Sequence, residues 1–127
     1  FTLAELLVVV AIVGILVAIS VPLFTAQLGK ARKATNQANM RAAKIAAVAQ
    51  YVVNKNDGKE VYYSYNITQG TVTSVNPYEK PSESTYEVKD IENAASNRLY
   101  TDIKVGVCVE NPDVPTRTTT VEIFVNK

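Results

Sequence analysis

The sequence predicts an α+β fold, in which a long N-terminal α-helix packs against a three- to four-stranded antiparallel β-sheet. The first observation behind this prediction is an uncharged apolar run that continues into a helically spaced stripe, up to about residue 54. The second is an alternation of apolar and polar residues in the rest of the chain. The 127 residues therefore divide into an apolar half-helix at 1–28, an amphipathic half-helix at 29–54 and a globular β-domain at 55–127.

Residues 1–28 are long and apolar enough to cross a bilayer. No charged residue occurs in the 24 positions from 6 to 29, and a helix of that length extends ~36 Å against a hydrocarbon thickness of ~30 Å. Because the segment is apolar on every side, it is unlike a surface helix of a soluble domain. A secretory signal peptide would begin with basic residues and have a shorter apolar core. An ordinary membrane anchor leaves the charge of Glu5 unexplained.

The start of this segment resembles the N-terminal signature of type IV pilins and the related pseudopilins. That signature has an aromatic first residue, Thr or Ser second, Glu fifth, Gly near position 14 and Pro at 22, and this sequence has Phe1, Thr2, Glu5, Gly14 and Pro22. The resemblance implies a subunit of a type IV pilus, a helical filament on the bacterial cell surface that serves adhesion or twitching motility. Beyond these residues the resemblance is architectural only.

The resemblance also implies processing, partners and a role for one charge. A prepilin peptidase would cut before Phe1, whose amine would then be N-methylated. The chain would be a single-pass membrane protein until an inner-membrane assembly platform adds it to a filament of identical copies. In the filament, Glu5 would pair with the Phe1 amine of a neighbouring copy, which offsets the cost of a lone carboxylate in an apolar environment. Within one helix the same two groups could also approach each other. Ala4 departs from the signature, where a larger aliphatic residue is more frequent.

Gly14 and Pro22 are expected to weaken the helix. Pro22 has no N–H to donate and its ring clashes with the carbonyl of Ala18. Membrane helices tolerate both residue types, whereas the resemblance implies that the helix between them melts or kinks in the filament. We favour local melting over mere tolerance.

A narrow stripe of apolar or small residues continues from 24 to 52 at alternating spacings of four and three. We expect it to pack on the sheet or on other helices, and its alanine content argues against a coiled-coil dimer. The helix should end near residues 54–58, where Asn, Asp and Gly are typical of a helix C-terminus. The members of the stripe are Phe24, Leu28, Ala31, Thr35, Ala38, Ala42, Ile45, Ala49 and Val52.

The remaining residues predict β-structure. Gly70 closes a turn between the first two expected strands, and residues 111–115 connect the last two, so two hairpins are expected. A loop at 76–84 and a short helical turn at 90–96 complete the domain. The expected strands are residues 60–66, 71–75, 98–110 and 116–126, and residues 85–89 could form a further short strand, so that three or four of these segments make up the expected sheet.

The composition argues against an enzyme and against a cofactor. The chain has no His, and Cys108 is its single cysteine, which excludes a histidine-based catalytic pair, an intrachain disulfide and a thiolate metal cluster. Asp90 and Glu92 are the closest acidic pair, and a solvated surface explains them better than a calcium site. DNA is a possible partner, but the net charge of +1 gives no electrostatic support for DNA binding.

Three functions stay open at this point. The leading hypothesis is a major structural pilin whose main partner is itself. The second is a pseudopilin of a type II secretion system or a subunit of a competence pilus, which filament length on cells would distinguish. The third is a monomeric, membrane-tethered binding domain, for which Glu5 would be dispensable and no filament would form.

Overall fold

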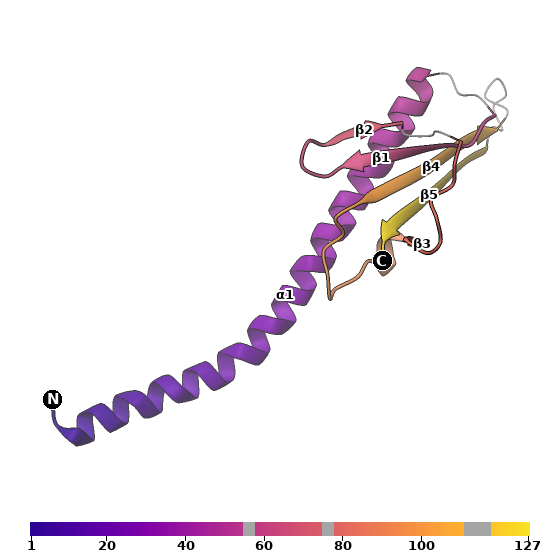
Figure 1. Cartoon of the computed structure of the whole chain (residues 1–127). Helices are drawn as coiled ribbons and strands as arrows, with labels where there is room; N and C mark the ends of the chain where they lie inside the picture. Colours follow the sequence, from indigo (N-terminus) through magenta and orange to yellow (C-terminus); the bar gives the residue numbers. More distant parts are fainter. Residues whose placement is uncertain (55–57, 75–77, 111–117) are drawn as a thin grey trace.

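A computed structural model describes residues 1–54, 58–74, 78–110 and 118–127 (Figure 1). The fold is α+β as expected, with one long helix packed against an antiparallel sheet. Within these described residues the sheet has five strands in the order β2-β1-β4-β5-β3, slightly more than the three or four expected. In chain order the elements are α1 (Leu3–Asn54), β1 (Val61–Asn66), β2 (Thr71–Thr73), β3 (Tyr86–Val88), the short 3₁₀ helix η1 (Ile91–Asn93), β4 (Ile103–Glu110) and β5 (Thr118–Asn126).

Both expected hairpins are confirmed. Tyr65 of β1 lies opposite Val72 of β2, and Val105 of β4 lies opposite Ile123 of β5. Gly70, with φ of +70°, adopts the left-handed conformation that the first turn requires. The strand expected at 98–110 begins only at residue 103, and the loop expected at 111–115 lies outside the described residues.

The hydrophobic core lies between α1 and one face of the sheet. Every second residue of β1 and β4 is buried against this core, as expected for strands with one face on a core. Tyr62 and Gly106 lie between these positions and are buried as well, because the Tyr62 ring covers Gly106 on the other face of the sheet. Met40 and Tyr51 are the large helix residues that reach this core. The sheet contributes Val61, Tyr63, Tyr65, Ile103, Val105, Val107, Val109, Ile123 and Val125.

The apolar stripe expected to face the sheet is the wrong face of α1. Ile45 and Val52 are 70% and 64% exposed, and Ala42 is the one member that is even partly buried. Alanine is abundant on several sides of this half-helix, so the packed face is decided by its few larger side chains and by one buried amide. Packing of the exposed stripe on other helices stays a prediction. The buried face carries Asn36, Met40, Ala43, Ala47 and Tyr51.

A polar side chain of α1 fixes a loop that we call the basal loop, residues 94–102. Asn36 is fully buried, and its amide nitrogen donates to the carbonyl oxygens of Ala95 at 2.9 Å and Arg98 at 2.8 Å. Its Oδ1 accepts the N–H of Tyr100 at 3.0 Å. Two of these bonds, those to Arg98 and Tyr100, join the backbone of residues 98–102 to the helix, which explains why this segment is not a strand.

The C-terminal strand is joined to the basal loop by a polar network. Asn126 Oδ1 accepts the N–H groups of Thr101 at 3.1 Å and Asp102 at 3.2 Å, and its own N–H donates to the Asp102 carbonyl at 3.2 Å. The Arg98 guanidinium donates to the Asn126 carbonyl and forms an ion pair of 3.0 Å with Glu87. The end of β5 is therefore held to the basal loop and β3 without a covalent link.

Candidate functional site

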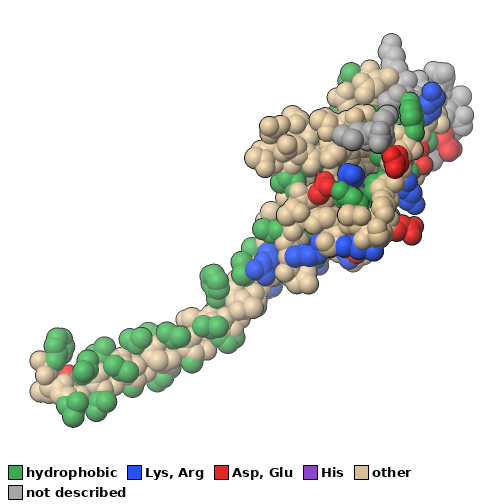
Figure 2. All heavy atoms as spheres, in the orientation of Figure 1, with side chains coloured by type: hydrophobic (Ala, Val, Ile, Leu, Met, Phe, Trp, Pro, Cys, Tyr) green, Lys and Arg blue, Asp and Glu red, His purple; other side chains and the backbone are tan. Residues whose placement is uncertain are grey.

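The first half of α1 projects from the folded part of the molecule (Figure 1). We call residues 1–28 the apolar rod and the described residues from 29 onward the head. Leu7, Ile15 and Phe24 are 61%, 61% and 69% exposed, and Figure 2 shows apolar side chains along the whole visible face of the rod. An 18-residue window of α1 has a mean hydropathy of 3.0 and no buried residue. By length and composition, α1 could cross a membrane.

The N-terminus of the rod is closed by a reciprocal pair of hydrogen bonds. The Thr2 N–H donates to Glu5 Oε2 at 3.1 Å, and the Glu5 N–H donates to Thr2 Oγ1 at 3.2 Å. This capping box satisfies two donors that the first turn of a helix otherwise leaves open. Sequence reasoning missed it, although the spacing Thr-x-x-Glu before an apolar run is its known signal.

The structure brings Phe1 and Glu5 to one end of the rod without pairing their charges. In the part of the chain that the structure describes, no ion pair joins the Phe1 amine to the Glu5 carboxylate; one oxygen of that carboxylate bonds to Thr2 instead. A concave surface beside the carboxylate is lined by Phe1, Ala4, Glu5, Val8 and Val9. The pairing expected within one helix is therefore not seen, and the pairing expected between copies stays a prediction.

Gly14 and Pro22 lie inside a helix that is continuous in the single chain. A Cβ at Gly14 would meet no atom of the described residues within 4 Å, so no contact with them requires glycine there. On either side of Pro22, the hydroxyls of Ser20 and Thr25 donate to carbonyl oxygens four residues earlier, at 2.7 and 3.0 Å. Proline and such hydroxyl bonds both bend helices, and Figure 1 shows the rod inclined to the rest of α1.

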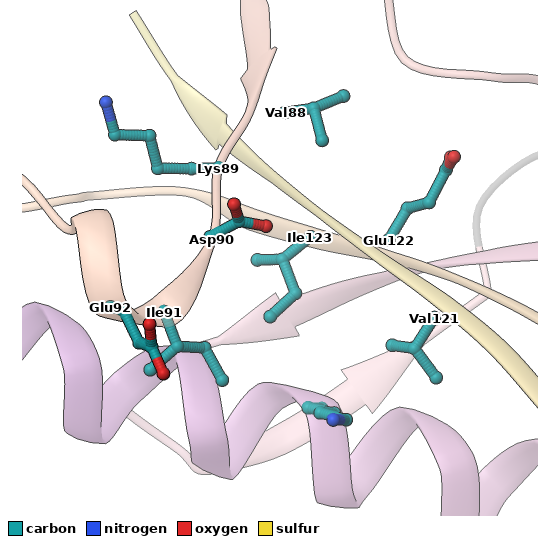
Figure 3. A pocket seen from close by; sticks show the side chains of 9 residues that line it. Val88, Lys89, Asp90, Ile91, Glu92, Val121, Glu122 and Ile123 are labelled. Carbon is teal, nitrogen blue, oxygen red and sulfur yellow. The ribbon is translucent and has the colours of Figure 1, made fainter.

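A cavity of about 430 Å³ lies between α1, η1 and β5 (Figure 3). Its walls mix basic and acidic side chains, and Figure 3 shows Lys89 and Glu122 pointing away from the Asp90 carboxylate on opposite sides. Among the described residues, no three acidic or cysteine side chains come together as a set of metal ligands.

Cys108 is a free, partly buried thiol on β4. Burial raises its pKa, and the negative charges of Glu110 and Glu60 raise it further. A raised pKa disfavours the reactive thiolate at neutral pH.

Comparison with known proteins found no matching family model, no curated relative and no matching solved structure.

Proposed function

We propose that this chain is a structural subunit of a helical surface filament of the type IV pilus kind, and that it is held in a membrane before assembly. The exposure of the apolar rod carries the proposal. Seventeen large apolar side chains of residues 1–28 are exposed; at ~1.5–3 kcal/mol for each full burial, and with roughly half of each exposed, their hydration costs on the order of 20 kcal/mol. This exceeds the ~5–15 kcal/mol by which a typical domain is stable. The rod therefore needs lipid or other copies around it.

Glu5 favours burial of the rod against other copies of the chain over permanent burial in lipid. A carboxylate in an apolar environment is stabilised by a positive partner, and among the described residues Glu5 has hydrogen bonds to Thr2 but no ion pair. The concave surface beside Glu5 is open. We propose that it receives the Phe1 amine of a neighbouring copy, after a peptidase has freed and methylated that amine.

The other signature residues fit the same proposal. The carbonyl opposite Pro22 lacks its helical donor, and Gly14 needs no small side chain for contacts within the chain. Both properties support local melting of the rod when copies pack closely. An assembly platform would supply the energy for extraction from the membrane, and long filaments on cells would distinguish a pilus from a secretion pseudopilus or a competence pilus.

Glu5→Gln tests the proposal because it removes the charge while keeping an oxygen that can accept the Thr2 N–H. We expect normal membrane insertion and at least ~100-fold fewer filaments, since leaving one partner of a buried ion pair alone costs ~3–5 kcal/mol. Filaments are counted by electron microscopy of sheared surface material, and insertion is measured by membrane fractionation. Thr2→Val is the matched control, because it removes the cap hydroxyl and keeps the charge. Wild-type filament yield from Glu5→Gln would refute charge pairing, and if neither wild type nor variant forms filaments the chain is a tethered monomer.

A further inference from the structure

The basal loop reaches farther toward the rod than the strands of the sheet do (Figure 1). The carbonyl oxygen of Ser96 lies 3.7 Å from the position of a Cβ on Gly29, the first residue after the rod. Three hydrogen bonds from Asn36 hold the loop at this height. The distance between the tip of the loop and the end of the rod is therefore fixed by the fold.

Three basic residues lie at the same height on α1. Lys30 and Lys33 are exposed and Arg32 is partly exposed, and none of the three forms an ion pair with any described residue. Figure 2 shows basic side chains where the rod meets the head. The basal loop adds no acidic residue before Asp102, whose carboxylate accepts the hydroxyl of Tyr86. The base of the head, meaning Lys30, Arg32, Lys33 and the tip of the basal loop, is thus a basic surface.

The base of the head lies at the distance beyond the rod at which the polar headgroup layer of a membrane would lie. Lys30 and Lys33 lie ~3 and ~8 Å beyond Leu28 along the helix axis, at 1.5 Å per residue. The headgroup layer on each side of the hydrocarbon is ~5–7 Å thick. Lys44, by contrast, lies ~24 Å beyond Leu28 and is out of reach of headgroups. Basic residues close to an anionic leaflet are attracted to it.

We infer that the base of the head rests on anionic lipid headgroups while the rod spans the membrane. The inference rests on the membrane-held stage of the proposed function and adds a second contact to it. Lys30, Arg32 and Lys33 meet the phosphates, and the loop tip at Ser96 and Asn97 lies among the headgroups. Asn36, which ties the loop to α1, then sets the height of the head above the membrane.

Tryptophan fluorescence of the full chain tests this contact, because the sequence contains no Trp. Asn97→Trp reports on the loop tip, Leu16→Trp on the rod, and Tyr78→Trp on an exposed ring whose neighbour is Lys59, at the other end of the head. Each variant is reconstituted in vesicles of phosphatidylglycerol and phosphatidylethanolamine, and in vesicles of phosphatidylcholine alone. Lipids that carry a spin label at the headgroup quench a nearby indole.

We expect several-fold stronger quenching of the Asn97→Trp indole than of the Tyr78→Trp indole in the phosphatidylglycerol vesicles. The difference should shrink in phosphatidylcholine, at high salt and with Lys30→Gln/Lys33→Gln added. Equal unfolding midpoints of the variants confirm that the head is intact.

Different failures have different meanings. If Leu16→Trp is quenched by lipids labelled in the acyl chain but Asn97→Trp behaves like Tyr78→Trp, the headgroup contact is wrong and membrane insertion stands. If Leu16→Trp is not quenched either, both are wrong. Quenching of Asn97→Trp that is equal in phosphatidylcholine overturns the selectivity for anionic lipid. If the fluorescence of the Asn97→Trp indole changes only when filaments form, the base of the head contacts another copy and not lipid, and the inference is overturned.

Discussion

At the scale of single residues, hydrogen bonds from a polar side chain, and not only apolar contacts, hold the basal loop to α1. Asn36 is the one fully buried polar side chain in the described part of the chain. Its amide uses two donors and one acceptor on three different backbone groups of the basal loop. A buried amide is tolerated only when such partners are present, so Asn36 and the basal loop depend on each other.

Asn36→Ala should lower the free energy of unfolding by about 2–4 kcal/mol. The substitution leaves the Ala95 and Arg98 carbonyls and the Tyr100 N–H without a partner, and each unsatisfied buried group costs ~1–3 kcal/mol. Chemical unfolding followed by circular dichroism measures the change. Asn39→Ala, on a neighbouring face of the same helix, is the control and should cost well under ~1 kcal/mol because Asn39 is only partly buried. Equal effects of the two substitutions would contradict the anchoring role.

Tyr86 should make the head sensitive to alkaline pH. Burial raises its pKa from 10.0 to about 12, and the hydrogen bond to the Asp102 carboxylate and its charge act in the same direction. Because the folded pKa lies above the unfolded one, this contribution to stability is complete below pH 10 and is lost as the pH rises toward 12. We expect the unfolding midpoint to fall over that range, and to fall less steeply in Tyr86→Phe. Part of the fall should remain in Tyr86→Phe, because the pKa of Tyr62 is also raised to about 12. If the unfolding midpoint of Tyr86→Phe fell with pH as steeply as that of wild type, Tyr86 would be excluded as a cause of the alkaline sensitivity.

At the scale of elements, α1 is one helix with two environments. In the head, one face packs on the sheet and the opposite face, with Ile45 and Val52, is exposed. In the rod, no face is buried. Figure 1 shows the two halves inclined to one another, and Pro22 removes a donor from the helical hydrogen-bond ladder within the rod.

Pro22→Ala should tighten this part of the rod. The new N–H can donate to the Ala18 carbonyl, and an interior proline costs a helix ~3 kcal/mol. We expect slower amide hydrogen exchange at residues 18–26 of the full chain in detergent micelles, and filaments that stretch less under load. Ser20→Ala removes one hydroxyl bond but keeps the proline, so it should change exchange far less. Identical exchange in Pro22→Ala and wild type would remove Pro22 as the weak point.

Much of this architecture could be predicted from the sequence because it depends on periodicity. Alternation gave both hairpins and the core-facing residues of β4, and the uncharged run gave the rod. The packed face of α1 was predicted wrongly for two reasons. Alanine on several sides of the helix makes its faces nearly equal in hydrophobicity, and an asparagine such as Asn36 is expected at the surface unless buried hydrogen-bond partners are known. Those partners are some 60 residues away in sequence, and no local pattern indicates them. The Thr2–Glu5 cap is different, since its spacing was readable and was overlooked.

At the scale of the whole molecule, the rod and the head are suited to different solvents. The head has its own core between the second half of α1 and the sheet, and every buried residue of α1 lies at position 36 or later. The rod contributes nothing to that core and exposes apolar side chains on all sides. The fold of the head and the association of the rod should therefore be separable properties.

Deletion of residues 1–28 tests this separation. The remaining chain keeps every residue of the core, so it should fold in water without detergent, with a cooperative thermal transition and the strand content of the full chain by circular dichroism. Sedimentation should show a monomer, and electron microscopy no filaments, since the surface that costs on the order of 20 kcal/mol to hydrate has been removed. An unfolded fragment would mean that the rod supports the head. A folded fragment that still polymerised would mean that the head, and not the rod, drives assembly.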